Sequence, residues 1–396
     1  MTSHIRLGDH AIKIGSGQTP LGGQTSYQSS GIPFIRSQNV LMGTFTCDGL
    51  AHISEAQDRQ MSGSRVEKRD VLINITGASI GRVCVVPDDV CPANVNQHVC
   101  IIRCDSALSP EYLAAFLASP NFQEFIWQSQ AGGTRQALRK EMVEGFQIPW
   151  LPVRDQNSLV SQLKSQLAAV EQARQAAKAQ VDDANRLIPA ILESAFSEIT
   201  EANFVKLGDI ANIQLGKMLS PKSKTGEQSF TYLRNTNVQW GRFDLRDLAF
   251  MDFSDRERMK FELQAGDLIV CEGGEPGRCA VWNAERADCY YQKALHRVRP
   301  HKVMADSEFL SYWIRHQAYA GSFEDQNAKT TIAHLPLVRL EQLPIPNVPI
   351  QRQLRIAESL KSRLATVDEI LHEAQAQLEQ IRQLPSRLLA QVFAQS

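Results

Sequence analysis

The chain has 396 residues, of which 43% are hydrophobic and 21% charged, and its formal net charge is −1. This composition is typical of a folded chain, long enough for two domains plus further elements. The charge argues against a broad basic surface for nucleic acid, although local Arg, Lys, Asn and Gln can still read bases while a basic partner supplies most phosphate contacts. The chain has no run of about 18 apolar residues and no apolar signal core in its first residues, so we expect a cytoplasmic protein.

The sequence lacks the common catalytic and metal-binding motifs. The glycine loops at 76–82 and 273–278 have neither the lysine nor the hydroxyl of a P-loop, and GxSxG, HExxH and the tetrapeptide of an adenine methyltransferase are absent. Eight cysteines occur without a CxxC pair, which favours reduced, mostly buried thiols. We therefore expect a noncatalytic chain that holds no metal and no cofactor of its own.

The most informative feature is an internal repeat of about half the chain. The matching segments occur in the same order in both halves, and their offset drifts only from 200 (207 − 7) to 197 (360 − 163). The pairs are RLGD and KLGD, IRSQNVLMG and LRNTNVQWG, RDVLINITGASIGR and GDLIVCEGGEPGR, PEYLAAFL and SEFLSYWI, IPWLPVRDQ and IPNVPIQRQ, and LKSQLAAV and LKSRLATV. Such colinearity indicates a duplication, with loops absorbing the differences in length.

Each repeat reads as a globular part followed by a long helix. The first globular part mixes short β-type runs with at least one helix, which predicts an α+β fold. The β-type runs include Val71 to Ile75, Val83 to Val86 and Val99 to Ile102, and the helix is predicted from Glu111 to Trp127.

The two long helices carry an apolar stripe in steps of three and four residues, which is typical of a coiled-coil seam. In the first copy the seam, which Arg174 interrupts, is Val160, Leu163, Leu167, Val170, Ala177, Val181, Ala184, Ile188, Ile191 and Ala195. In the second copy it is Ala357, Leu360, Leu364, Val367, Leu371, Ala374, Leu378, Ile381, Pro385, Leu388 and Val392. Since a lone helix could not bury such a stripe, we expect the two copies to pack against each other.

Prolines bound the seams. Pro189 and Pro385 lie inside the apolar pattern and should kink or break each helix, leaving a continuous seam from Gln156 to Leu187 and from Gln353 to Leu384. Two equal units that pair through equivalent helices suggest a pseudo-twofold axis. An antiparallel pair is favoured because the connection from Phe196 to Lys206 is too short to retrace a helix of about 50 Å.

The glycine loops have two interpretations, which are compatible. Gly77 and Gly81, like Gly273, Gly274 and Gly277, follow a β-type run, so they suit a tight hairpin that needs positive φ. Alternatively, such a loop approaches a DNA backbone, with Thr76, Ser79 and Arg82, or Arg278 in the second copy, donating to phosphate.

Polar side chains that suit base recognition cluster at equivalent places in the two repeats, although a solvated loop explains each of them equally well. Arg and Lys suit guanine, and Asn and Gln suit adenine, in the major groove. The candidates of the first repeat are Arg36, Ser37, Gln38, Asn39, Asn96, Gln97, His98, Thr134, Arg135 and Gln136. Those of the second are Arg234, Asn235, Thr236, Asn237, Gln292, Lys293, Lys329, Thr330 and Thr331, where Tyr291, Gln292 and Lys293 are aligned with Asn96, Gln97 and His98.

Taken together, these segments resemble the specificity subunit of type I restriction-modification enzymes over essentially the whole chain. The resemblance rests on the duplicated stretches Asp70 to Arg82 and Asp267 to Arg278, on Asn96 to His98, and on the proline-rich entry to each helix at Gln156 and Gln353. It implies two tandem target-recognition domains, 1–152 and 199–349, joined by long helices at 153–198 and 350–396 that form an antiparallel coiled coil. The second repeat departs from the pattern where Tyr291, Gln292 and Lys293 replace Asn-Gln-His.

The resemblance also implies a function and partners. Each domain would read half of a split site in double-stranded DNA, the helices would set the spacing, and two methyltransferase subunits would dock on them, followed by restriction and translocase subunits. S-adenosylmethionine, ATP and Mg would then belong to those partners. Two alternatives remain open: the recognition region of a self-contained methyltransferase or nuclease, and a coiled-coil scaffold unrelated to DNA.

Overall fold

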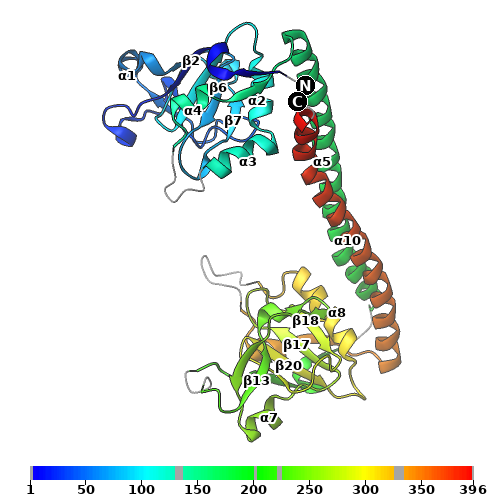
Figure 1. The fold of residues 1–396 in the computed structure, drawn as a ribbon. Helices are drawn as coiled ribbons and strands as arrows, with labels where there is room; N and C mark the ends of the chain where they lie inside the picture. Colours follow the sequence, from blue (N-terminus) through cyan, green and yellow to red (C-terminus); the bar gives the residue numbers. More distant parts are fainter. Residues whose placement is uncertain (1–2, 130–136, 200–202, 221–224, 325–333, 395–396) are drawn as a thin grey trace. The chain divides into compact units, whose positions relative to one another are not determined.

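The computed structural model describes residues 3–129, 137–199, 203–220, 225–324 and 334–394. The chain forms two compact units, drawn in Figure 1; the first comprises Met1–Lys178 with Ala376–Ser396, and the second Ala179–Gln375. Each unit contains a globular part and a segment of each long helix, α5 (Val153–Ser197) and α10 (Ile350–Ala394). Among the described residues, no helix is both long enough and apolar enough to cross a membrane.

The first unit contains two four-stranded sheets. One is antiparallel and has the order β2 (Ala11–Ser16), β9 (Val99–Cys104), β6 (Val71–Asn74) and β7 (Val83–Val85). The other pairs β3 with β8 in parallel and has the order β4 (Ala51–Ile53), β3 (Ile32–Ile35), β8 (Ala93–Val95) and β5 (Arg65–Val66). The remaining elements are the strand pair β1 (His4–Arg6) with β10 (Gln147–Pro149) and the helices α1 (Glu55–Gln60), α2 (Pro110–Leu117), α3 (Pro120–Ser129) and α4 (Lys140–Glu144).

The second unit repeats this arrangement, except that its sheet with the parallel pair has three described strands where the first unit has four. Its antiparallel sheet has the order β12 (Ala211–Leu215), β20 (Leu295–Pro300), β17 (Asp267–Cys271) and β18 (Cys279–Trp282). The sheet with the parallel pair has the order β16 (Ala249–Asp252), β13 (Ser229–Leu233) and β19 (Cys289–Tyr291). The other elements are β11 (Phe204–Lys206) with β21 (Pro344–Pro346), β14 (Val238–Gln239) with β15 (Arg242–Phe243), and the helices α6 (Leu207–Ile210), α7 (Asp255–Phe261), α8 (Ser307–Tyr319) and α9 (Leu337–Glu341). The shared strand order confirms the internal repeat.

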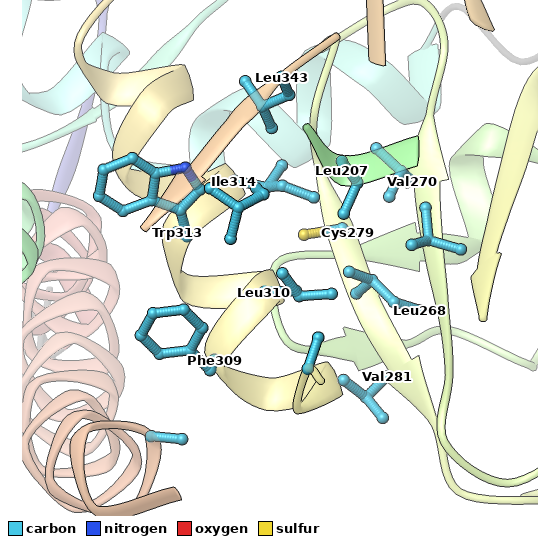
Figure 2. Close-up of a cluster of buried hydrophobic side chains, with 14 of the residues drawn as sticks. Leu207, Leu268, Val270, Cys279, Val281, Phe309, Leu310, Trp313, Ile314 and Leu343 are labelled. Carbon is cyan, nitrogen blue, oxygen red and sulfur yellow. The ribbon is translucent and has the colours of Figure 1, made fainter. Parts of the chain in front are cut away.

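The central strands are apolar without interruption because both of their faces are covered. Side chains alternate along a strand, so Leu268 and Val270 of β17 face helix α8, where they join Leu310 and Ile314 in one buried cluster (Figure 2). Ile269 points to the opposite face and packs with the second sheet of the unit. The first unit is layered in the same way, with α2 on one face of its antiparallel sheet (Figure 1).

The strands predicted in the first repeat are confirmed as β6, β7 and β9, each within two residues of its expected end. The single helix predicted from Glu111 to Trp127 is wrong. Two helices, α2 and α3, occupy this stretch, and Pro120 begins the second one. Proline suits this first helical position because the N–H that it lacks would have no partner within the helix, and the first hydrogen bond of α3 joins the Gln123 N–H to the Ser119 carbonyl at 2.9 Å.

The antiparallel pairing of the long helices is confirmed. In the first unit, Val160 near the start of α5 shares an apolar cluster with Phe393 at the end of α10. In the second unit, Phe196 at the end of α5 shares a cluster with Ala357 near the start of α10. Every residue of both predicted seams is buried or partly buried.

Neither long helix breaks at its internal proline, so the predicted ends at Leu187 and Leu384 are wrong. Proline removes one backbone hydrogen bond, but tertiary packing carries each helix onward. After Pro189, Leu192 and Phe196 are buried in the core of the second unit. After Pro385, Phe393 is buried in the core of the first.

A buried glutamine fixes each long helix to its globular part. The Gln156 side chain accepts from the Ser109 N–H and donates to the carbonyls of Ala107 and Leu151, at 2.8 to 3.0 Å. Gln353 repeats the arrangement in the second unit, accepting from the Asp306 N–H and donating to two carbonyls at 2.9 Å. With all of their amide groups satisfied, these glutamines set where each helix leaves its domain.

Candidate nucleic-acid interface

Three of the predicted segments of the first repeat, 36–39, 76–82 and 96–98, meet at one edge of the first unit. The parallel strands β3 and β8 end there together, so residues 36–39 and 96–98 follow side by side, and the Asn96 N–H donates to the Ile35 carbonyl at 3.0 Å. The β6–β7 loop joins them, since the Asn74 amide donates to the Ser37 carbonyl at 2.9 Å. Thr76 Oγ1 lies 2.5 Å from His98 Nδ1, which completes the cluster.

The second unit builds the same edge from the ends of β13 and β19. The Gln292 N–H donates to the Leu233 carbonyl at 3.1 Å, as Asn96 does to Ile35. The β17–β18 loop is joined through Arg278, whose Nη2 donates to the Asn235 carbonyl at 2.9 Å. Both repeats therefore bring together those of their predicted site residues that the structure describes.

Among the described candidates, exposure varies widely. The exposed ones are Gln38, Arg82, Gln97, Thr236 and Lys293. The partly buried ones are Arg36, Ser37, Thr76, Ser79, His98, Arg234, Asn235, Arg278 and Gln292, and the buried ones are Asn39, Asn96 and Asn237. Thr134, Arg135, Gln136, Lys329, Thr330 and Thr331 lie outside the described residues.

The prediction that Asn39 and Asn237 contact bases is wrong. Asn39 is fully buried, and its amide donates to the carbonyls of Thr46 and Asp48 while its oxygen accepts from the Arg36 N–H. Asn237 makes the equivalent three bonds in the second unit. Each asparagine holds the loop that follows it, and a side chain whose hydrogen-bonding groups are satisfied inside the fold has none left for a base.

The neighbouring arginines hold the same loops. Arg36 Nη2 donates to the Gly49 carbonyl at 2.6 Å, and Arg234 Nη2 donates to the carbonyl and carboxylate of Asp247 at 2.8 and 2.7 Å. In both, Nε is buried without a partner in the described part of the chain. Each guanidinium is therefore engaged in ordering the edge through its Nη2 group.

The predicted alignment of Asn96 to His98 with Tyr291 to Lys293 is wrong by one residue. Strand pairing sets Ile35 opposite Val95 in the first unit and Leu233 opposite Tyr291 in the second. Val95 therefore corresponds to the fully buried Tyr291. It follows that Asn96 corresponds to Gln292, Gln97 to Lys293 and His98 to Ala294. The loops have the same length in both repeats, from Val95 to Val99 and from Tyr291 to Leu295, so alignment on the shared glutamine was misleading and the strand register corrects it.

The glycine loops are hairpins, as one interpretation predicts. They connect the antiparallel pairs β6–β7 and β17–β18, and Gly77, Gly81, Gly274 and Gly277 have φ between 75° and 89°. Gly273, the fifth glycine, does not have positive φ.

The two loop arginines differ in the freedom of their side chains. Arg82 is exposed and makes no side-chain hydrogen bond or ion pair with a described residue, so it remains a candidate phosphate ligand. Arg278 instead bonds the Asn235 carbonyl and pairs with Glu275 at 2.9 Å. It orders the loop within the second unit.

One part of this edge was not predicted from the sequence. It is the segment that follows β2 in the first unit and β12 in the second. Thr19 Oγ1 donates to Gln97 Oε1 at 2.5 Å, and the Lys217 N–H donates to the Tyr291 carbonyl at 3.0 Å. These segments reach the edge because glycine precedes them. A Cβ on Gly17 would lie 1.8 Å from the Val95 carbonyl oxygen, and one on Gly216 would lie 2.3 Å from that of Gln292. The recurrence of this glycine at an offset of 199 (216 − 17) was the available signal.

The chemistry of the described residues is that of a binding surface. All eight cysteines are free, five of them are buried, and burial raises the pKa of the Cys100 and Cys84 thiols to about 12. No group of three or more His, Cys, Asp or Glu side chains that could hold a metal ion occurs within the described ranges. The edge consists of amides, hydroxyls and cations, which can recognise base edges and phosphates.

Comparison with known proteins assigns this architecture to a class. The family model for the type I restriction modification DNA specificity domain matches residues 200–380. The specificity subunit of the type I restriction enzyme EcoBI from Escherichia coli is 30% identical over 173 residues, which cover 42% of this chain and 35% of that subunit. The EcoKI specificity subunit from Escherichia coli K12 is 20% identical over 392 residues, covering 91% of this chain and 82% of that subunit.

Solved structures share the fold over nearly the whole length. A chain from a study of complex assembly and conformational transition of the type I R-M system has a TM-score of 0.76 at 16% identity, covering 98% of this chain and 97% of its own. The HsdS subunit from Thermoanaerobacter tengcongensis has a TM-score of 0.63 at 17% identity, covering 98% and 96%. Residues 200–380 therefore match the family model for type I restriction modification DNA specificity domains. The chain as a whole is similar in sequence to these type I specificity subunits and in fold to the two solved structures.

Proposed function

We propose that this chain is the noncatalytic DNA-specificity subunit of a type I restriction-modification complex and that it reads a bipartite site in double-stranded DNA. Each unit would read one half-site with the edge described above. The observation that carries the proposal is that two units of one fold present different exposed side chains at equivalent positions. Gln38 and Gln97 in the first unit correspond to Thr236 and Lys293 in the second.

This difference is chemically meaningful for DNA recognition. Glutamine amides pair with adenine in the major groove, lysine with guanine O6 and N7, and threonine with several bases. Two half-sites of different sequence would follow from these side chains. The alternative of a coiled-coil scaffold unrelated to DNA gives no reason for the repeats to differ at their outward-facing positions while sharing buried anchors such as Asn39 and Asn237.

The partners follow from the same proposal. Two modification (methyltransferase) subunits would dock on the long helices, and restriction subunits would join them. S-adenosylmethionine, ATP and Mg would be bound by those subunits and not by this chain. Most of the phosphate contacts that a chain of net charge −1 lacks would come from the same partners.

Selection of duplexes from a random pool tests the proposal, with the purified chain alone and together with modification subunits. We expect recovered sites with two conserved half-sites separated by bases that do not matter. Incubation of the chain with radiolabelled S-adenosylmethionine and mixed DNA should transfer no label. Recovery of unrelated sequences would contradict the recognition function, and labelled DNA from the pure chain would contradict its noncatalytic role.

A further inference from the structure

A cavity of about 680 Å³ opens in the second unit between the segment after β12 and helix α7. One wall is made by Gly216, Lys217 and Met218. The other includes Arg256 and Lys260 of α7. We call the edge formed by the segments after β3, β6 and β8, and by those after β13, β17 and β19 in the second unit, the recognition edge. Helix α7 is not part of it.

The base of the cavity is electrically balanced. Lys217 Nζ donates to the Asp252 carbonyl at 2.6 Å and pairs with Glu257 at 2.8 Å. Burial alone would raise the pKa of Glu257, but hydrogen bonds from Lys217 and from the Ser254 N–H and hydroxyl lower it below its ordinary value. Glu257 is therefore ionised at neutral pH, and its charge is matched by Lys217.

Arg256 and Lys260 are left as uncompensated cations at the cavity. They are exposed and lie four residues apart on α7, so they project from the same side of the helix. Neither forms an ion pair with a residue of the described part of the chain. The nearby carboxylate of Asp255 pairs with Arg258, and that of Asp252 accepts from the N–H groups of Thr225, Gly226 and Gln228.

The cavity adjoins the recognition edge. The backbone of Lys217 accepts from the Lys293 N–H at 2.8 Å and donates to the Tyr291 carbonyl at 3.0 Å. Its wall therefore continues directly into the exposed Lys293, which occupies the position of Gln97 in the first unit. Lys217 links the two features, because its backbone bonds to Lys293 and its side chain pairs with Glu257 of α7, so a DNA strand whose base is read at Lys293 would pass close to α7.

The first unit has the same helix without the charge. Helix α1 begins at the N-cap Ser54 with the capping box that Ser54 shares with Ser254 of α7. From that cap onward, Ala56 stands at the position of Arg256 and Gln60 at that of Lys260. Gln18 stands at the position of Lys217 because each follows the close-packed glycine. The corresponding surface of the first unit is thus uncharged at all three positions.

We propose that this cavity binds a backbone phosphate of the DNA flanking the second half-site, with the Arg256 guanidinium and the Lys260 ammonium as donors. The first unit has no cation at the positions of Arg256 and Lys260. The second unit would therefore bind the DNA at its half-site with the stronger electrostatic attraction. The inference rests on the proposed DNA-specificity function. It adds a sequence-independent contact that belongs to one unit alone.

The test converts α7 to the charge pattern of α1. The double variant Arg256→Ala with Lys260→Gln is compared with the unaltered full-length chain, both with modification subunits, for binding to the selected bipartite duplex across a series of salt concentrations. A matched control, Lys206→Gln with Lys302→Gln, removes two exposed cations from the same unit. Lys206 lies in β11 and Lys302 follows β20, at the end of the sheet away from the recognition edge. The reciprocal variant Ala56→Arg with Gln60→Lys installs the cations on α1.

We expect the α7 variant to bind all duplexes more weakly by a similar factor and the slope of log K against log salt to become shallower by about 1 for each lost contact. The half-site preference should stay unchanged, the control should behave like the unaltered chain, and the α1 variant should steepen the slope. An unchanged slope for the α7 variant would overturn the inference, and so would an altered preference at the second half-site. If the unaltered chain selects no bipartite duplex, the proposed function itself fails, which is a different result.

Discussion

The first unit presents glutamines and a free arginine at its recognition edge, whereas the second presents lysine, threonine and, beside them, the cationic helix α7. Beneath the edge the two units are alike. Asn39 and Asn237 hold equivalent loops. Gln156 and Gln353 fix equivalent long helices, α5 and α10, through equivalent sets of three hydrogen bonds. The comparison teaches that the buried polar groups maintain one scaffold while a few exposed positions distinguish the units.

The largest difference in stability is expected at a buried ion pair that both units contain. Asp267 pairs with Arg299 at 2.6 Å, and Asp70 pairs with Arg103 at 2.8 Å. Removing one partner of a fully buried pair costs about 3 to 5 kcal/mol, and we expect the lower end of this range here because the arginines are 20% and 33% exposed. We expect Asp267→Ala to be the more damaging, because Arg103 keeps a second carboxylate, that of Glu67.

Hydrogen exchange measured strand by strand tests this, since β17 and β6 report on the two units separately. Asp267→Ala should remove more protection from β17 than Asp70→Ala removes from β6. Equal losses would show that the Glu67 contact adds nothing.

The second prediction concerns the glutamine anchors, where the units should behave alike. Gln156→Ala and Gln353→Ala each leave buried backbone groups without partners, which costs about 2 to 3 kcal/mol. Both should lower the midpoint of urea unfolding by similar amounts. The exposed neighbours Asn157→Ala and Gln351→Ala are the controls and should leave it nearly unchanged. A silent Gln353 variant would mean that the helix is fixed by its apolar contacts alone.

The third prediction separates the readers. Gln38→Ala with Gln97→Ala should relax the preference at the first half-site only, and Thr236→Ala with Lys293→Ala at the second only, each lost base contact being worth about 1 to 3 kcal/mol. Selection from a random duplex pool measures both. Asn39→Ala serves as the contrast, because its expected effect is on stability. Uniform weakening across all sequences would assign these side chains to phosphate contacts instead.

The smallest expected effect is a pH dependence confined to the second unit. His296 is fully buried, and burial lowers its pKa below the ordinary value of 6.5, although its bond to the Leu335 carbonyl opposes the shift. The unfolded chain takes up a proton that the folded chain resists, so stability is full above pH 6.5 and falls as the pH drops below it. The slope of this loss is at most about 1.4 kcal/mol per pH unit, the limit for uptake of one proton.

The strand positions make Cys100 the counterpart of His296 in the first unit, and its thiol stays neutral throughout this range. Urea unfolding at several pH values, compared with His296→Gln, isolates the contribution of the histidine. The glutamine variant keeps an N–H donor and should lose the pH dependence. If it retains the full dependence, another group is responsible.

The sequence by itself determined the repeat, the seam of the long helices and the glycine hairpins. Each of these is encoded by spacing along the chain: a constant offset between copies, apolar residues in steps of three and four, and glycine at turns that need positive φ. The antiparallel order of the helices followed from the short connection after Phe196, which is also a property of the chain. Recognition chemistry could be assigned to segments in the same way, because polar residues gather at equivalent places.

Tertiary structure decided which members of those segments are free to bind. Asn39 and Gln38 are adjacent and equally polar, yet one is buried under bonds to residues 46–48 and the other is exposed. The register of Gln292 and Lys293 depended on pairing with Leu233, about 60 residues away. Helix α5 continues past Pro189 because Leu192 and Phe196 are buried in the apolar core of the second unit. The role of a side chain at such positions depends on which distant group packs against it, and that information is absent from local spacing.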